Sequence, residues 1–366
     1  MKILEVIDSL GWCGTKEQTY LNALHLSKHF EVHLALAFGH REMIERLKGK
    51  VELKFYEVDN GSKRRFNIKN YLRLYQIVKE GNYDVLIANS SWSLNYVIGI
   101  LPFLKKKPKI IALRRSGFTP SFFSKHLKYR FVDKIVVVSK KVAEHLINIG
   151  FFPEKIVVIE SGIDLSRFKP SEELREEYRK RLGLGKEHKV FVNVANWQPW
   201  RKGQDTLLEV FSWVVKKHKN LKLLLVGKDT DSEQARKLIK SFNLENHTIA
   251  LGYREDVEKI LQAGDYFVLT SRSEGIAGSL LQAMACGKVV LSTLAGGIGE
   301  YLIDGFNGFS AQVDNKEEIA QKLEKMINIS KEEYSRLSEN AINTAKNYSI
   351  ETNIKKWVDL ISSLSD

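Results

Sequence analysis

Short apolar runs alternate with longer amphipathic stretches along this chain. Runs that are apolar throughout, rather than at every second position, are typical of strands buried on both faces of a parallel sheet. Helical periodicity lies between them, for example over residues 68–78 and 141–149. In the first half the strand-like runs are 2–8, 32–38, 85–89, 109–113, 134–139 and 155–160.

The second half repeats this pattern, with helical stretches such as 204–217 and 233–242. Its strand-like runs are 190–195, 221–227, 248–252, 266–271, 288–293 and 309–313. Strands that alternate with helices, twice over, predict an α/β fold with two doubly wound, Rossmann-like sheets. Ligands of open α/β sheets bind outside the carboxyl ends of the strands, so we expect the chemistry just after these runs.

The length also favours two domains, since 366 residues is more than twice a typical domain of about 150 residues. We expect an N-terminal domain over 1–168 and a C-terminal domain over 187–347. The segment 169–186 is interpreted as a linker, because it contains Pro170 and a dense charged run.

Composition narrows the class of protein. A hydrophobic fraction of 43% with 28% charged residues excludes a disordered chain, and two cysteines exclude a disulfide framework and favour a reducing compartment. Glu5 and Asp8 interrupt the first apolar run, which argues against a signal peptide. The longest apolar run, 96–104, is about half of what a membrane-spanning helix needs. We therefore expect a soluble, cytoplasmic protein.

The net charge of +13 lies entirely in the first half. Residues 1–170 hold 29 basic and 16 acidic side chains, whereas residues 171–366 hold 28 of each. Residues 102–131 contain nine basic side chains and no acidic one, with aromatic residues among them. One interpretation is a solvated basic face. The other is a surface that meets an anionic partner, such as a nucleic acid, a membrane or an anionic substrate.

Two loops carry candidate chemistry. After the first strand, Gly11 and Gly14 permit a tight turn, and a helix from Thr15 points its amides out of the sheet edge. The loop lacks the G-x-G-x-x-G spacing, so an ordinary strand–turn–helix connection is an equal alternative.

The second loop follows the run that ends at Thr270. Amides near 277–280, at the start of a helix, favour an anion, whereas Glu274 just before them would compete with it. A ligand with both phosphates and hydroxyls resolves the conflict. Gln282 lies eight residues on, about 12 Å along a helix, a span that suits a nucleotide-sugar. Alternatively, Glu274 is a helix-start acid and Gln282 a surface residue.

Residues 274–287 resemble the signature of the family 4 glycosyltransferases, which have the GT-B fold. That motif reads Glu-Gly-Phe-Gly, has a second Glu eight residues after the first, and continues with Ala-Met-Ala-x-Gly; here the segment is EGIAGSLLQAMACG. The resemblance continues through 137–146, 155–170 and 295–309. It implies two Rossmann-like domains that face a central cleft, with the last helix, 348–366, packing back on the first domain.

The resemblance implies transfer of a sugar from a nucleotide-diphosphate donor, with retention at the anomeric carbon. Carried over by position, the catalytic residues are Lys202 and Arg201, which face the diphosphate, and Glu274, which holds sugar hydroxyls. The donor-binding positions are Gly14, Thr15, Tyr253, Arg254, Arg272, Ile276, Ala277, Gly278, Leu280, Leu281 and Gln282. No group of histidine, cysteine or acidic residues has metal-ligand spacing, so we expect neither a metal nor another cofactor.

Three positions depart from the family pattern. Gln282 replaces the second Glu of the motif, and an amide offers ribose a weaker pair of hydrogen bonds than a carboxylate. Trp197 stands five residues before Lys202, where the family has an arginine, and Arg201 or Arg272 could supply that charge. Arg115 aligns with a histidine of many relatives.

The acceptor is expected to be an anionic, membrane-associated glycan or lipid, such as a lipopolysaccharide core, which would place the protein at the inner face of the cell membrane. Its candidate contacts are Lys105, Lys106, Lys107, Arg114 and Arg115. Two alternatives stay open: another GT-B activity such as a sugar epimerase, or a catalytically silent GT-B protein that binds a membrane or nucleic acid. The leading interpretation involves no nucleic acid.

Overall fold

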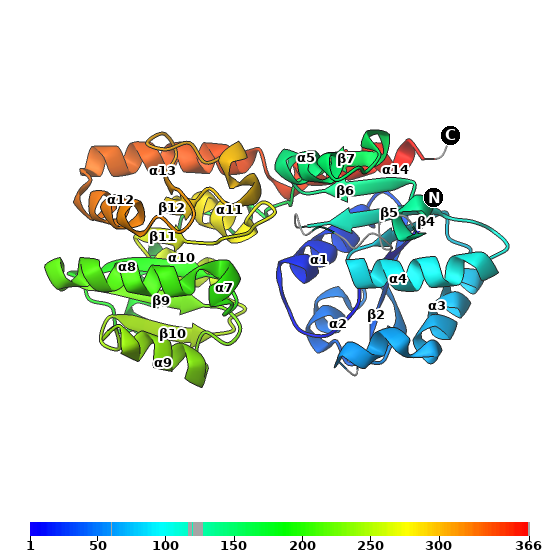
Figure 1. Cartoon of the computed structure of the whole chain (residues 1–366), viewed down its shortest axis with the longest axis horizontal. Helices are drawn as coiled ribbons and strands as arrows, with labels where there is room; N and C mark the ends of the chain where they lie inside the picture. Colours follow the sequence, from blue (N-terminus) through cyan, green and yellow to red (C-terminus); the bar gives the residue numbers. More distant parts are fainter. Residues whose placement is uncertain (60, 116–118, 120–126, 365–366) are drawn as a thin grey trace. The chain divides into compact units, whose positions relative to one another are not determined.

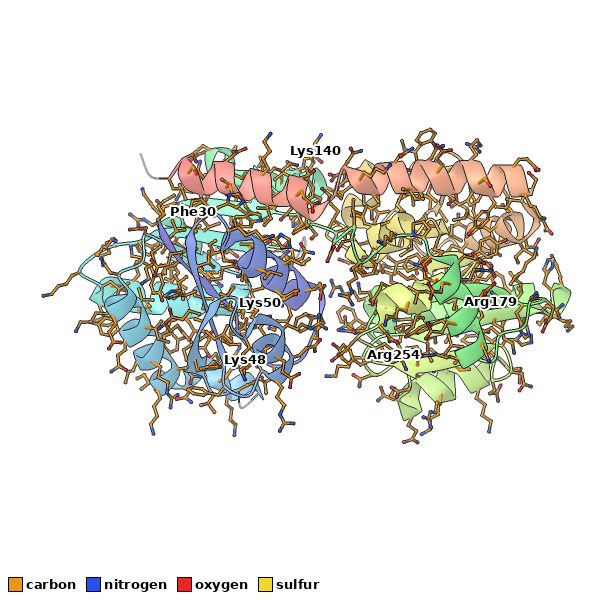
Figure 2. The ribbon with its side chains drawn as sticks, turned by 180° about the vertical axis from the view of Figure 1, so that it is seen from behind. Phe30, Lys48, Lys50, Lys140, Arg179 and Arg254 are labelled. Carbon is orange, nitrogen blue, oxygen red and sulfur yellow. The ribbon has the colours of Figure 1, made fainter. Side chains whose placement is uncertain are left out.

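The computed structural model describes residues 1–59, 61–115, 119 and 127–364. The chain forms two compact units (Figure 1). The first unit comprises Met1–Gly162 and Ile350–Asp366, and the second comprises Ile163–Ser349. Lys48 and Lys50, labelled in Figure 2, are exposed on the first unit.

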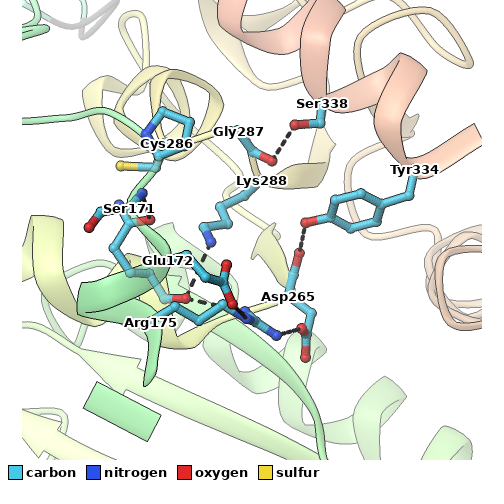
Figure 3. A pocket seen from close by; sticks show the side chains of 11 residues that line it. Ser171, Glu172, Arg175, Asp265, Cys286, Gly287, Lys288, Tyr334 and Ser338 are labelled. Carbon is cyan, nitrogen blue, oxygen red and sulfur yellow. Dashed lines mark hydrogen bonds and ion pairs between the residues drawn. The ribbon is translucent and has the colours of Figure 1, made fainter. Parts of the chain in front are cut away.

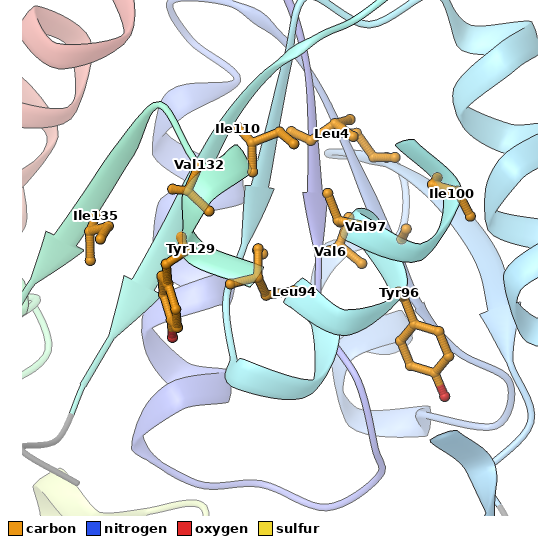
Figure 4. Close-up of a cluster of buried hydrophobic side chains, with 14 of the residues drawn as sticks. Leu4, Val6, Leu94, Tyr96, Val97, Ile100, Ile110, Tyr129, Val132 and Ile135 are labelled. Atoms are coloured by element: carbon orange, nitrogen blue, oxygen red, sulfur yellow. The ribbon is translucent and has the colours of Figure 1, made fainter. Parts of the chain in front are cut away.

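The first unit is built on a seven-stranded parallel sheet with the strand order β3-β2-β1-β4-β5-β6-β7. Side chains alternate between its two faces. Leu4 and Val6 of the first strand enter one buried cluster (Figure 4), and Ile3 and Ile7 enter the other. Burial on both faces explains the uninterrupted apolar runs. The strands are β1 (Lys2–Val6), β2 (Glu31–Ala37), β3 (Glu52–Glu57), β4 (Val85–Ala88), β5 (Lys109–Arg114), β6 (Lys134–Val137) and β7 (Ile156–Val158).

Helices cover both faces of this sheet. They include α1 (Gly14–Leu26), α2 (Arg41–Leu47), α3 (Ile68–Gly81), α4 (Ser91–Ile100), α5 (Lys140–Asn148) and the C-terminal α14 (Ile350–Ser362). Short 3-10 turns are η1 (Gly61–Phe66), η2 (Leu101–Phe103), η4 (Tyr129–Phe131) and η5 (Pro153–Lys155). The chain returns to the first unit through α14, where Trp357 is 1% exposed and the Asn353 amide donates to the carbonyl of Glu160.

The second unit repeats the arrangement on a six-stranded parallel sheet with the order β10-β9-β8-β11-β12-β13. Its strands are β8 (Lys189–Val194), β9 (Leu221–Val226), β10 (Thr248–Gly252), β11 (Tyr266–Leu269), β12 (Val289–Thr293) and β13 (Phe309–Ala311). Its helices are α6 (Glu172–Arg181), α7 (Pro199–Lys202), α8 (Gln204–Lys217), α9 (Glu233–Ser241), α10 (Val257–Ala263), α11 (Gly278–Ala285), η6 (Gly296–Glu300), α12 (Lys316–Asn328) and α13 (Lys331–Lys346). Two such sheets confirm the predicted α/β class with two Rossmann-like units.

The unit boundary differs from the expected linker at 169–186. That segment contains α6, which packs on α10 within the second unit. The Arg175 guanidinium lies 2.5 Å from an Asp265 carboxylate oxygen, and the Tyr178 hydroxyl donates to Asp256 at 2.7 Å. Residues 163–168 also belong to the second unit. The charged segment therefore makes specific contacts with α10 and the residues beside it, rather than forming a solvated connection.

Within the described ranges, no helix has both the length and the apolar character that crossing a bilayer requires.

Candidate functional site

The loop after β11 brings together two residues that are 72 positions apart in the chain. The Lys202 ammonium lies 2.6 Å from the Glu274 carboxylate, and the Ser271 hydroxyl donates to the same oxygen at 2.6 Å. Glu274 is only 7% exposed, and these partners satisfy a carboxylate that water hardly reaches. The predicted catalytic lysine and the predicted sugar-binding carboxylate thus stand together at the carboxyl edge of the second sheet.

A tight backbone contact positions Lys202. The next residue, Gly203, has a φ of +65°, and a Cβ there would lie 1.9 Å from the carbonyl oxygen of Thr270. The Thr270 hydroxyl donates to the carbonyl of Gly203 at 2.8 Å. Only glycine permits so close an approach, because any other side chain would collide with the end of β11. The contact holds the short helix α7, and therefore Lys202, against the Glu274 loop.

A second glycine contact holds the loop from the other side. Gly296, with a φ of +60°, approaches so closely that a Cβ would lie 1.9 Å from the carbonyl oxygen of Glu274. The Gly297 amide donates to the carbonyl of Gly275 at 2.9 Å, and the buried Tyr301 hydroxyl donates to that of Ile276 at 2.7 Å. Three successive residues of the loop are thus fixed by η6 and the residue that follows it.

The loop ends at the N-terminus of α11, where Ala277 has a φ of +53°. The amides of Leu280 and Leu281 already donate to the Ala277 carbonyl, at 3.0 and 3.4 Å. The amides that precede them in the helix, those of Gly278 and Ser279, therefore offer the better donors to an anion. Leu280 and Leu281, which were among the expected donor-binding positions, thus have amides already engaged within the helix.

Replacing Ala277 with glycine is expected to stabilise the protein by up to about 1 kcal/mol. The left-handed conformation costs an alanine about 1–2 kcal/mol, and the extra freedom of glycine in the unfolded chain offsets about half of the gain. Urea denaturation measures the difference. The control is Ala283→Gly in the interior of α11, where glycine should destabilise by about 1 kcal/mol. Equal destabilisation by both variants would contradict the role assigned to Ala277.

Two of the predicted arginines of the second unit, Arg272 and Arg254, are engaged by acids. The Arg272 guanidinium donates to Asp205 at 2.9 and 3.0 Å and to Asp314 at 2.8 and 3.0 Å. Arg254 donates to Asp256 at 2.8 and 2.7 Å, and these bonds lower the pKa of Asp256 to about 2. Arg272 therefore ties the start of α8 to the loop after β13, and two carboxylates offset its charge.

The remaining donor-binding candidates lie at several places. Tyr253 is 41% exposed just after β10, and Gln282 is half-buried on α11. Arg201 precedes Lys202 in α7, and its carbonyl accepts from the Arg272 amide at 2.8 Å. Gly14 and Thr15 begin α1 in the first unit, directly after the loop that follows β1.

The carboxyl edge of the first sheet holds a charged network that the sequence did not single out. Arg64 of η1 contacts Asp8 at 3.3 Å, Glu57 at 3.2 Å and Asp59 at 3.4 Å. Burial raises the pKa of Glu57, which accepts from the Tyr96 hydroxyl at 2.9 Å. Asp8 and Asp59 come within two residues of the ends of β1 and β3, and Glu57 ends β3. Acidic residues at or just after the end of a strand were the feature of the sequence that could have identified this network.

Two buried lysines complete this edge. The ammonium of Lys16 donates to the Asp8 carbonyl and to the Ser9 hydroxyl, the latter at 3.1 Å. Lys128 donates to the Ser91 hydroxyl at 2.9 Å, and burial lowers the pKa of Lys128 to about 8. The edge therefore presents both charges and hydroxyls, as a polyhydroxylated or phosphorylated ligand would need.

The basic run 102–131 is divided between two edges of the sheet. Lys105, Lys106 and Lys107 precede β5 at its amino end, where Lys106 pairs with Asp84 at 2.7 Å. Arg114 is the last residue of β5, at the carboxyl end, and is 8% exposed.

Arg115 follows Arg114 and is half-buried, with its Nε and Nη2 atoms shielded from solvent. Burial lowers the pKa of Arg115 to about 10 and raises that of the nearby Glu5 to about 8. Residues 116–118 and 120–126 of the run lie outside the described residues. The five predicted acceptor or membrane contacts therefore do not form one surface.

A pocket of about 490 Å³ lies at the opposite edge of the second sheet, at the amino ends of β11 and β12 (Figure 3). The buried Lys288 ammonium donates there to the carbonyls of Gln262 and Gly264 at 3.3 and 3.1 Å. Arg175 donates to the same two carbonyls. These cations cap the C-terminus of α10, so the pocket has a structural explanation.

Comparison with known proteins identifies the family. A family model described as glycosyl transferases group 1 matches residues 174–344, and one described as glycosyltransferase family 4 matches residues 14–167. The chain belongs to the group 1 glycosyltransferases. The Glu274 loop and Lys202 lie within the first matched region, and the Arg64 network lies within or beside the second.

One relative of this glycosyltransferase is named for a diphospho-undecaprenol substrate. The N,N'-diacetylbacillosaminyl-diphospho-undecaprenol alpha-1,3-N-acetylgalactosaminyltransferase of Campylobacter jejuni is 30% identical over 61% of this chain and 58% of its own length. The chain thus matches less than two thirds of that relative.

Solved structures share the fold. Anabaena HepE in complex with UDP and glucose has a TM-score of 0.86 at 22% identity, over 99% of this chain and 100% of its own. WaaG, a glycosyltransferase involved in lipopolysaccharide biosynthesis, has a TM-score of 0.74 at 18% identity, over 98% and 99% of the two chains.

This glycosyltransferase has Trp197 at the position where the family pattern has an arginine, and the tryptophan is part of the hydrophobic packing. Trp197 packs against the buried cluster of the second unit, whereas Trp200 is 68% exposed. A side chain with that environment contributes packing rather than charge. Lys202 is therefore the cation nearest to Glu274 for which the structure gives a direct contact.

Proposed function

We propose that this protein is a retaining, metal-independent glycosyltransferase. It transfers a sugar from a nucleotide-diphosphate donor to an anionic, membrane-associated glycan or lipid of the cell envelope. The observation that carries the proposal is the ion pair of Lys202 with Glu274, beside the N-terminus of α11 and at the carboxyl edge of the sheet. That edge is where doubly wound folds bind nucleotides.

The donor fits this site in a defined orientation. Its sugar hydroxyls donate to Glu274, and its diphosphate meets the Lys202 ammonium and the amides of Gly278 and Ser279. Gln282, one turn further along α11, faces the ribose. The Anabaena protein with the same fold was solved in complex with UDP and glucose, which supports a uridine diphosphate sugar as the first donor to test.

The residues then contribute positioning and charge. As the bond from the anomeric carbon to the diphosphate breaks, negative charge grows on the leaving oxygen, and Lys202 stabilises it. The acceptor hydroxyl attacks the same face of the sugar and gives its proton to the departing phosphate oxygen. No side chain forms a covalent bond in this scheme, and a protein cation carries out the task that a metal performs elsewhere.

The acceptor binds at the edge of the first sheet. The buried Lys16 and Lys128 provide positive charge there, and the Campylobacter relative is named for a diphospho-undecaprenol substrate. Both observations support a phosphorylated, lipid-linked acceptor.

The test is release of UDP from a panel of UDP-sugars, with and without a chelator. Nuclear magnetic resonance of the glycoside product then reports the anomeric configuration. We expect UDP release that survives the chelator and a product with the configuration of the donor. An inverted product would reject the retaining mechanism, and no UDP release from any sugar would favour the silent alternative.

Replacing Gln282 with glutamate is expected to tighten UDP binding about 3- to 10-fold. A carboxylate accepts hydrogen bonds from both ribose hydroxyls, and charge-assisted bonds are about twice as strong as neutral ones. Isothermal titration with UDP measures the change. Gln321→Glu on the exposed face of α12 adds the same charge away from the site and should leave affinity unchanged. Unchanged or weaker binding by the Gln282 variant would remove this residue from the ribose.

A further inference from the structure

Large apolar side chains are exposed together on η1 and the start of α3. Phe66 is 75% exposed, Ile68 is 71% exposed and Leu72 is 57% exposed. Ile68 and Leu72 are one helical turn apart, so they share one face of α3. Single exposed apolar residues are ordinary, but a group of this kind marks a surface that another molecule covers.

The charge around this group is of one sign. Residues 61–79 contain six basic side chains and no acidic one: Lys63, Arg64, Arg65, Lys69, Arg73 and Lys79. The Arg65 guanidinium lies over the rings of Phe66 and Trp92, at 4.7 and 5.0 Å from their centroids. Arg73, next to Leu72, lies 5.4 Å from the ring centroid of Phe38, which is itself 45% exposed.

This combination selects the kind of partner. Basic side chains next to exposed aromatic and aliphatic ones match an interface with anionic headgroups outside and acyl chains inside. A nucleic acid would use the cations and the aromatic rings, but it offers nothing apolar for Ile68 and Leu72. An anionic lipid bilayer accounts for every exposed group.

The surface is attached to the edge where the acceptor is proposed to bind. It begins four residues after β3, and Arg64 of η1 contacts Asp8 and Glu57 beside the carboxyl ends of β1 and β3. A bilayer that touched Phe66 and Ile68 would therefore present lipid headgroups to that edge. Lys105–Lys107, by contrast, lie before β5 at the amino edge, about 20 Å away along a six-residue strand.

We propose that η1 and the first half of α3, which we call the η1–α3 surface (Lys63, Arg65, Phe66, Ile68, Lys69, Leu72 and Arg73), dock this protein on anionic membranes. The docking places the acceptor edge of the first unit at the lipid headgroups. The inference rests on the proposed function in one respect, namely that the acceptor is linked to a lipid. Binding of the protein to lipid vesicles can be measured whether or not that function is correct.

The test is co-sedimentation with vesicles of equal parts phosphatidylglycerol and phosphatidylcholine. The triple variant F66S/I68S/L72S keeps every charge and removes three exposed apolar side chains, so its partition coefficient should fall about 10- to 100-fold. The matched control K105S/K106S/K107S removes three charges at the amino edge and should bind within about twofold of the parent. Circular dichroism melts verify that both variants are folded.

Three outcomes would overturn the proposal. These are no binding of the parent to anionic vesicles, parent-like binding by F66S/I68S/L72S, or a larger loss in the lysine control. The first would point to a protein partner for the exposed group. Release of UDP from a UDP-sugar by the parent protein without vesicles is measured in parallel, so failure of the proposed function is seen separately from failure of docking.

Discussion

Replacing Lys202 with alanine is expected to lower turnover by about 10²–10³-fold, the scale of one lost electrostatic stabiliser. In the scheme proposed here its ammonium offsets charge that develops on the leaving diphosphate, so the effect should fall on kcat more than on KM. Steady-state kinetics with a UDP-sugar measure both. Lys228→Ala, an exposed lysine just after β9 on the same edge of the sheet, is the control and should stay within about twofold.

The ion pair makes a second measurement informative. Without Lys202, the nearly buried Glu274 keeps the Ser271 hydroxyl but loses its cation, so K202A should also melt at a lower temperature. Adding E274Q removes the unpaired charge and should restore the melting temperature without restoring turnover. Turnover of K202A within a factor of two of the parent would show that Lys202 is not the diphosphate contact.

Replacing Gly296 with alanine is expected to destabilise the protein by about 2–4 kcal/mol and to weaken sugar binding. The added Cβ would lie 1.9 Å from the carbonyl oxygen of Glu274, at a φ of +60° that L side chains rarely adopt. Backbone must move to relieve the contact, and that backbone carries the Glu274 carboxylate. Urea denaturation gives the stability, and titration with a UDP-sugar against UDP isolates the sugar contribution.

Gly299 provides the matched control in the same 3-10 turn. A Cβ at Gly299 would meet only Leu294 Cδ2 at 3.9 Å, an ordinary contact. Gly299→Ala should therefore change stability by less than about 1 kcal/mol and leave the selectivity for UDP-sugar over UDP intact. Similar behaviour of the two variants would mean that the Gly296 contact does not hold the Glu274 loop.

The fold class and the family were predictable from the sequence. Strands buried on both faces, such as 2–8 and 266–271, are uninterrupted apolar runs because both faces of their sheets are covered by helices. The signature around Glu274 depends on local geometry, in which a loop after a strand is followed by a helix N-terminus. Local structure of this kind is determined by consecutive residues, so it can be predicted from the sequence.

The tertiary structure decided which charges meet, because that depends on residues far apart in the chain. Arg272 looked like a diphosphate ligand, but the fold brings Asp205 and Asp314 onto it. Arg64 became an anchor only because β1 and β3, which flank β2, end at the same edge of the sheet and bring Asp8 and Glu57 within its reach.

The basic run 102–131 also separates what the sequence determined from what the tertiary structure decided. By itself the sequence determined that unusual positive charge gathers in the first half, and that the chain builds two parallel sheets with a sugar-nucleotide signature after one strand. Only the fold showed that β5 carries this run from one edge of the sheet to the other and shields guanidinium nitrogens of Arg115 beside Glu5. A strand advances about 3.3 Å per residue, so residues that are neighbours in a charge count can face opposite sides of a domain.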